Sequence, residues 1–200
     1  MADELTLYDN RGSSNARKVR FLLGELNLTA QLIDVPIEGS RPDWYHQIHP
    51  FGTVPTLVDG DVVLVESNTM LRYLADREGR DDLYPREAAA RARVDQLLDV
   101  LSLVIRPALW EVELRTCYAT VPAPRAELAN AVRGLEEALV GWERLIEAGG
   151  YLTGTFSIAD IAATARMWLL PQLPVNPGVA PKTFRMLDVV GARQACQSAL

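Results

Sequence analysis

Two adjacent serines at the beginning of the first predicted helix have the clearest potential for chemistry. Ser13 and Ser14 follow the turn residue Gly12 and precede an apolar helical face. A serine hydroxyl at a helix N-terminus can donate a hydrogen bond to a ligand thiolate, helped by the positive end of the helix. These contributions lower the pKa of a thiol, ordinarily about 8.5, by roughly one to two units. The alternative is that the hydroxyl only caps the helix.

A second pattern, Phe51-Gly52-Thr53-Val54-Pro55, predicts an exposed peptide edge. Pro55 cannot donate a hydrogen bond to a sheet, so it is expected at an edge or in a special turn. A cis Val54–Pro55 bond costs only about 0.5–1 kcal/mol more than the trans form. It would turn the N–H and C=O of Val54 outward, where an extended peptide can pair with them. Taken alone, the pattern is also typical of an ordinary turn.

A third pattern, Glu66-Ser67, lies at a predicted strand-to-helix junction. The first N–H groups of a helix lack partners and carry partial positive charge, so they suit a carboxylate. Glu66 beside them can hold an ammonium group, and a zwitterionic amino-acid end carries both charges. The alternative is that Ser67 is only an N-cap. Together the three patterns predict a site for a thiol-containing tripeptide.

Strands and helices in the order β-α-β-β-β-α are predicted to position these residues, which is typical of a thioredoxin-like fold. The predicted strands cover residues 5–8, 31–35, 56–58 and 62–65. The first helix follows Ser13 and ends near Asn27, and the last covers 67–77. Asp59-Gly60 between the third and fourth strands is a strong hairpin signal.

From residue 86 onward the apolar periodicity is helical, which predicts an all-helical bundle domain. Pro107 is expected to kink its first long helix, because proline removes a backbone donor. Ser157 and Asp160 form a capping box at the start of a core helix, to which we assign no chemistry. We therefore divide the chain into a thioredoxin-like domain (1–79), a linker (80–85) and an all-helical domain (86–200).

The composition is that of an ordinary globular protein of 200 residues, 48% hydrophobic and 23% charged. A net charge of −6 argues against nucleic acid as a partner, because phosphate contacts require a basic surface. No apolar run approaches the roughly 20 residues of a membrane span. The acidic start, Met1–Leu5, is unlike a secretion signal, so we expect a cytoplasmic protein without a membrane partner. Two distant cysteines and two histidines suit neither a disulfide framework nor a metal site.

The whole chain resembles the glutathione S-transferase family, and in particular its serine-type theta-, phi- and zeta-like bacterial members. The matching stretches are Leu7-Tyr8, 13–20, His49 to Leu57, Glu66-Ser67 and Ser157 to Asp160. The resemblance implies glutathione as cosubstrate or cofactor, no metal, a small-molecule electrophile as partner, and a homodimer. It assigns Ser13 to the thiol-activating hydroxyl, with Ser14 as the alternate.

The resemblance also assigns the remaining site residues. Val54 and Pro55 correspond to the edge that pairs with the cysteinyl unit, and Glu66 and Ser67 to the γ-glutamyl site. Thr53 replaces the family's usual Gln or Lys and is a weaker partner for the glycyl carboxylate, which Arg41 or His49 would compensate. We expect the acceptor site between the domains, lined by Tyr8, Arg11, Arg106 and Trp110. Its arginines suit an aromatic or acidic electrophile, unless they are simply solvated.

The reaction itself stays open at this point. The same thiolate serves conjugation, as in detoxification, cis–trans isomerisation of maleyl-type compounds, and elimination. Ser13-Ser14-Asn15 resembles the Ser-Ser-Cys opening of zeta-class isomerases, except that Asn15 replaces the cysteine. A non-catalytic binding module is a further alternative. An enzyme that uses another thiol is a third alternative. Lys18 and Lys182 are the only lysines in this arginine-rich chain, which is typical of high-GC bacteria, and some of these bacteria use thiols other than glutathione.

Overall fold

A computed structural model of the protein describes residues 5–37 and 39–199. It divides into two compact units, one running to Tyr84 and joined by the segment from Arg193, the other spanning Pro85–Ala192. The N-terminal residues 1–4, on which the cytoplasmic expectation depends, lie outside the described ranges. Within these ranges, no helix is both long and apolar enough to cross a membrane.

A four-stranded mixed sheet forms the centre of the first unit. Its strands are β1 (Leu5–Asp9), β2 (Ala30–Asp34), β3 (Thr56–Asp59) and β4 (Val62–Leu64), in the spatial order β2-β1-β3-β4. β1 is parallel to β2 and antiparallel to β3. Asp59 pairs with Val62, so Gly60 and Asp61 form the hairpin turn, with Gly60 at a φ of 57°. The predicted hairpin is confirmed.

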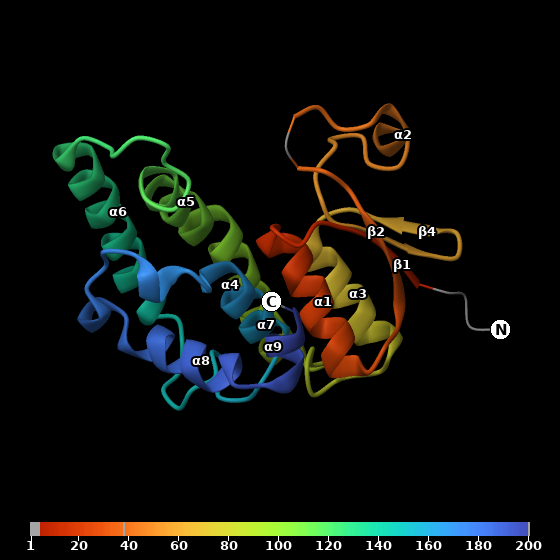
Figure 1. The fold of residues 1–200 in the computed structure, drawn as a ribbon. Coiled ribbons are helices and arrows are strands. Elements are labelled where there is room, and N and C mark those ends of the chain that lie inside the picture. The colour runs from red at the N-terminus through yellow and green to blue at the C-terminus, as the bar shows by residue number, and fades with distance from the viewer. Residues whose placement is uncertain (1–4, 38, 200) are drawn as a thin grey trace. The chain divides into compact units, whose positions relative to one another are not determined.

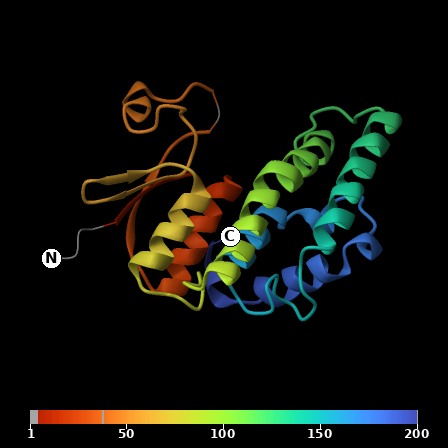
Figure 2. The same ribbon diagram turned by 180° about the vertical axis from the view of Figure 1, so that it is seen from behind.

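The helices α1 (Ser14–Leu26) and α3 (Ser67–Arg77) lie side by side against the sheet (Figures 1 and 2). Buried residues of α1 include Val19 and Leu22, as its apolar spacing predicts. The helix ends at Asn27, which adopts a left-handed conformation with a φ of 54°. One short helix, α2 (Asp43–His46), lies between the second and third predicted strands, where the sequence analysis placed no helix. At four residues, it is too short to produce a periodic pattern.

In the second unit, the predicted long helix is interrupted by a π-helical turn that ends two residues before Pro107. α4 (Ala88–Val100) passes through a π-helical turn (Leu101–Ile105) into α5 (Arg106–Arg115). The N–H of Arg106 donates to the carbonyl of Leu101, five residues earlier, which is the π-helical pattern. The proline thus stands in the first turn of α5, where its missing N–H costs little.

The helix α7 (Ile158–Met167) is the core of the second unit, because all ten of its residues are buried. It packs against α4 and against α8 (Pro181–Gly191), while α6 (Arg125–Glu143) packs against α5. Short 3-10 turns cover Leu170–Gln172 and Pro177–Val179. The predicted capping box of Ser157 and Asp160 is present at the start of α7.

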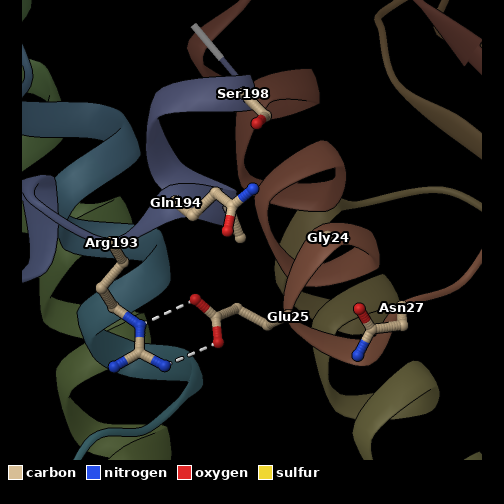
Figure 3. A pocket seen from close by; sticks show the side chains of 7 residues that line it. Gly24, Glu25, Asn27, Arg193, Gln194 and Ser198 are labelled. Atoms are coloured by element: carbon tan, nitrogen blue, oxygen red, sulfur yellow. Dashed lines mark hydrogen bonds and ion pairs between the residues drawn. The ribbon is translucent and has the colours of Figure 1, made fainter.

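The structure groups the C-terminal helix α9 (Gln194–Ala199) with the first unit, whereas the sequence placed residues 86–200 together. α9 packs against α1, where a Cβ added to Gly24 would lie 3.0 Å from Cβ of Ala195. Arg193 donates two 2.7 Å hydrogen bonds to the Glu25 carboxylate, beside a cavity of about 490 Å³ (Figure 3). The glycine and the ion pair explain this attachment, which no periodicity in the sequence could indicate.

Deprotonation of the buried Asp160 is expected to destabilise the fold. Burial raises the pKa of its carboxyl from 3.8 to about 6, against hydrogen bonds from the Leu152 N–H and from Ser157. A pKa that is higher in the folded state gives stability that is present below about pH 4 and lost as the pH rises through 6. We expect the free energy of unfolding to fall by up to about 3 kcal/mol over this window.

Urea unfolding of the wild type and of Asp160→Asn at a series of pH values measures this effect. The variant should lack the part of the pH slope that comes from Asp160. Identical slopes in the two proteins would contradict the expectation.

Candidate functional site

Ser13 stands at the N-terminus of α1, immediately before its first residue. Its Oγ accepts a hydrogen bond from the N–H of Ala16 at 3.3 Å, so the hydroxyl does cap the helix. Capping uses a lone pair of the oxygen and leaves the O–H proton able to donate. Among the residues that the structure describes, this proton has no acceptor. Capping and donation to a ligand are therefore compatible.

The loop between β1 and α1 fixes the position of Ser13 through Asn10. The side-chain amide of Asn10 donates to the carbonyl of Val35 at 3.0 Å and accepts from the N–H of Gly12 at 3.0 Å. Its backbone carbonyl accepts from the N–H of Ser13 at 2.9 Å. Ser14 is the first residue of α1, and the first turn contains no acidic residue that would neutralise the positive helix end.

The Val54–Pro55 peptide bond is cis, as the sequence suggested. The segment before it is held by Tyr45, whose buried hydroxyl donates to the carbonyl of Thr53 at 2.7 Å and lies 2.9 Å from Oγ1 of Thr56. Tyr45 also packs against Val54 and Tyr8. The loop is thus attached both to the sheet and to the aromatic residues beneath it.

Gly52 is required by the conformation of the same loop. It has a φ of 62°, and an added Cβ would lie 2.5 Å from Cε1 of His46. Its carbonyl accepts a 2.9 Å hydrogen bond from Nε of Arg41. This bond places the guanidinium of Arg41 next to the loop that carries Thr53.

The start of α3 differs from the start of α1 because no side chain caps it. The N-cap residue is Glu66, which is exposed, has a φ of 68° and makes no capping hydrogen bond. Ser67 is the first helical residue, so the suggestion that it serves as the N-cap is wrong. Its buried hydroxyl lies 3.4 Å from Nζ of Lys18, which also donates to Oδ1 of Asn68 at 3.1 Å.

Strand pairing brings Ser13, the Val54 segment and the start of α3 to the same end of the sheet. β1 is antiparallel to β3, and Tyr8 pairs with Thr56, so the end of β1 adjoins the start of β3. Leu64, at the end of β4, pairs with Leu57, also at the start of β3. Ser13, Val54 and the start of α3 therefore follow or precede strands at one sheet end. This end offers a hydroxyl donor, a peptide edge and an uncapped helix N-terminus.

Comparison with known proteins identifies the family of the chain. A family model described as glutathione S-transferase, N-terminal domain, matches residues 7–82. Glutathione S-transferase F10 of Arabidopsis thaliana is 32% identical over 79% of this chain and 77% of its own length. Glutathione S-transferase theta-3 of Mus musculus is 32% identical over 82% of this chain and 71% of its own. The chain belongs to the glutathione S-transferase family.

Solved structures extend the comparison to the whole fold. A theta class glutathione S-transferase of the citrus canker pathogen Xanthomonas axonopodis pv. citri, with glutathione bound, is 27% identical, with a TM-score of 0.86 over 98% of this chain and 97% of that one. Among the sequence relatives, a stringent starvation protein A homolog of Haemophilus influenzae is 26% identical over 86% of this chain and 77% of its own length. The two-unit fold, with a thioredoxin-like sheet and a helical unit, is thus the glutathione S-transferase fold.

His49 is placed differently from its suggested role at the glycyl carboxylate. It is 1% exposed, and both ring nitrogens bond within its own loop. Phe51 N–H donates to Nδ1 at 3.2 Å, and Nε2 lies 3.0 Å from Oγ1 of Thr53. Nδ1 is therefore the acceptor and Nε2 carries the proton of a neutral ring. His49 organises the loop and has no nitrogen left for a ligand.

The residues expected at the acceptor site lie in both units. In the first, the ring of Tyr8 is 6.0 Å from that of Trp44, and Arg11 is exposed. In the second, Arg106 is exposed at the start of α5, and the ring of Trp110 lies 5.3 Å from that of Tyr118. Within the described ranges, no three His, Cys, Asp or Glu side chains gather as metal ligands.

Lys18 is the main residue that sequence reasoning overlooked. It was noted only as one of two lysines, although it lies in a matching stretch. It is 3% exposed and its ammonium contacts Ser67 and Asn68, which lie about fifty positions away in the sequence. A lysine at an otherwise buried position of the α1 pattern is the one signal that could have indicated it.

The His49 geometry predicts its protonation behaviour. Burial lowers the pKa of His49 below the ordinary 6.5, with Glu66 acting in the opposite direction. We expect NMR titration to give a pKa below 6.5 and the Nε2–H tautomer at neutral pH. The variant His49→Gln identifies the signal. An Nδ1–H tautomer, or a pKa above 6.5, would contradict the hydrogen-bond arrangement.

Proposed function

We propose that this protein binds glutathione at the described end of the sheet and activates its thiol for attack on a small electrophile. The single observation that carries the proposal is the hydroxyl of Ser13, which caps α1 and keeps a proton without an acceptor among the described residues. It stands at the same end of the sheet as the Val54 edge and the uncapped start of α3.

In the proposal, the cysteinyl unit of glutathione pairs with the backbone of Val54 next to the cis Pro55. Strand addition of this kind uses main-chain hydrogen bonds for affinity. The support is the way in which Tyr45 holds the preceding carbonyl of Thr53 and thereby fixes the direction of the segment. An edge that is ordered before the ligand arrives loses less conformational entropy on binding.

The γ-glutamyl end is proposed to bind at the start of α3. Its carboxylate would accept hydrogen bonds from the first N–H groups and from the hydroxyl of Ser67, and its ammonium group would face Glu66. The Lys18 ammonium behind Ser67 adds positive charge to the same place. A buried charge acts through a lower effective dielectric than an exposed one, so it contributes more strongly there.

At the glycyl end, we propose Arg41 and Thr53, and not His49, as the partners of the carboxylate. The Nε of Arg41 donates to the Gly52 carbonyl, which holds the guanidinium beside the loop that carries Thr53. In the proposal, its Nη groups donate to the glycyl carboxylate. A guanidinium binds a carboxylate more strongly than a threonine hydroxyl does, because the hydrogen bond is charge-assisted.

The chemistry would start from the thiolate. Ser13 donates its proton as a hydrogen bond to sulfur, and the α1 N-terminus adds a favourable potential that no acidic residue in the first turn offsets. The sulfur then attacks an electrophilic carbon and either displaces its leaving group as an anion or adds to a double bond, which then takes up a proton from water. We propose aromatic or acidic substrates, with Tyr8, Arg11, Arg106 and Trp110 as the candidate residues that bind them. Conjugation is the outcome we propose first, with cis–trans isomerisation of maleyl-type compounds as the alternative outcome.

Removal of the Ser13 hydroxyl should weaken thiolate formation. We expect Ser13→Ala to raise the pKa of bound glutathione by about one unit, because the helix end still stabilises the thiolate, and to lower kcat/KM at neutral pH by roughly tenfold. Absorbance of the bound thiolate as a function of pH, together with conjugation of a model electrophile, measures both effects.

Ser14→Ala is the matched control and should leave both quantities close to those of the wild type. Full activity of Ser13→Ala with Ser14 intact would exclude the assigned role. A large effect of Ser14→Ala alone would move the assignment to Ser14.

A non-catalytic glutathione S-transferase-like module for partner binding, which need not bind glutathione, is the second candidate. The observation that favours it is the match to stringent starvation protein A homologs, whose names state no transferase activity. The weaker glycyl partner Thr53 points the same way.

Retention on immobilised glutathione separates the candidates. We expect retention of the wild type and roughly tenfold weaker binding of Ser67→Ala, because the γ-glutamyl carboxylate loses a buried hydrogen-bond donor. Thr69→Ala, an exposed change on the same helix turn, is the matched control. No retention of the wild type would favour the module that does not bind glutathione.

By the same family relationship we propose that the protein is a cytoplasmic homodimer. We also propose a thioredoxin-like domain of residues 1–79 and a helical domain that begins at residue 86, with α9 belonging to the first of them. Sedimentation of the purified protein tests the oligomeric state.

A further inference from the structure

The side chain of Arg20 binds four acceptor groups, three of which lie at or next to the loop that carries Ser13. Its guanidinium forms an ion pair with the carboxylate of Asp9. It also donates to the carbonyls of Asn10 and Arg11, each at 3.4 Å. Two further hydrogen bonds, at 3.3 and 3.1 Å, reach the carbonyl of Ala199. The side chains of Arg20 and Asp9 are only 12% and 6% exposed.

Three of these acceptors are consecutive in the chain, namely Asp9 at the end of β1 and Asn10 and Arg11 in the loop that follows it. The carbonyl of Asn10 accepts from Arg20 and also from the N–H of Ser13, at 2.9 Å. Arg20 therefore contacts the same carbonyl group, that of Asn10, whose hydrogen bond fixes the position of Ser13 at the start of α1. A displacement of the Asn10 carbonyl would also displace the Ser13 hydroxyl, because only Arg11 and Gly12 lie between the two residues.

The remaining acceptor comes from α9, which is far away in the sequence. α9 is held against α1 by the close approach at Gly24 and by the Glu25–Arg193 ion pair, which Figure 3 shows. This attachment brings the carbonyl of Ala199 to the guanidinium of Arg20. The C-terminal helix thus supplies one of the acceptors of Arg20, the side chain that holds the Ser13 loop.

We propose that Arg20, oriented by the Asp9 carboxylate and by the α9 carbonyl, is a positioning residue for thiol activation by Ser13. The inference rests on the proposed function of Ser13. Only the planar fork of arginine reaches the carboxylate and the carbonyls together, since the lysine ammonium is a single point charge. Glutathione binding depends on other residues, so Arg20 acts on the thiolate and little on affinity.

The test compares Arg20→Lys with the wild type. The variant keeps a charge for Asp9 and loses the fork, so we expect the pKa of bound glutathione to rise by up to about one unit. The value of kcat at neutral pH should fall accordingly, with KM for glutathione nearly unchanged. Arg77→Lys is the matched control, because it alters the ion pair with Asp59 at the opposite end of β3 from the Ser13 loop, and its thiol pKa should equal that of the wild type.

Two further variants make the result decisive. Asp9→Asn removes the charge that orients Arg20 and should shift the thiol pKa in the same direction, which keeps the test available if Arg20→Lys does not fold. In the double variant Ser13→Ala/Arg20→Lys, the shift should not exceed that of Ser13→Ala alone, because Arg20 acts through Ser13.

The possible failures can be told apart. A shift with Ser13→Ala but none with Arg20→Lys or Asp9→Asn would overturn the positioning inference and leave the proposed function standing. An additive shift in the double variant, or an equal shift with Arg77→Lys, would also overturn it. No shift with Ser13→Ala would remove the proposed function and this inference together.

Discussion

A buried ammonium group connects the beginnings of the two helices on which the site depends. Lys18 of α1 donates to Asn68 and contacts Ser67, both in the first turn of α3. Burying a lysine is unfavourable unless polar groups surround it, so its position restricts how α1 and α3 can pack. The same contact keeps positive potential at one end of the sheet. A site for an anionic, zwitterionic peptide depends on that potential.

The strand order brings the other parts of the site to the same end of the sheet. Because β1 and β3 are antiparallel neighbours, a loop that follows β1 and a loop that precedes β3 must lie at the same end of the sheet. Each loop is then fixed by its own hydrogen bonds, from Asn10 in the first and from Tyr45 in the second. Ser13 and Val54 are thus held by side chains that do not themselves contact the ligand in the proposed binding mode. The affinity of such a site depends on this prior order.

Much of the fold could be predicted from the sequence because its signals are local. Asp59-Gly60 indicates its hairpin, Ser157 and Asp160 indicate a helix start, and Pro107 indicates the interruption before α5. The candidate site residues Ser13, Val54 and Ser67 could be identified for the same reason, since each lies in a short motif. The parts that escaped prediction depend on contacts between distant positions. The burial of Lys18, the tautomer of His49 and the packing of α9 on α1 are set by tertiary neighbours, which periodicity does not record.

The central claim is that one end of the sheet orients a thiol peptide toward Ser13. A crystal structure of the protein with glutathione bound tests it most directly. The account predicts the cysteinyl backbone paired with Val54 and the sulfur within hydrogen-bond distance of the Ser13 hydroxyl. A sulfur atom bound elsewhere, or no glutathione in the site at millimolar concentration, would contradict the account.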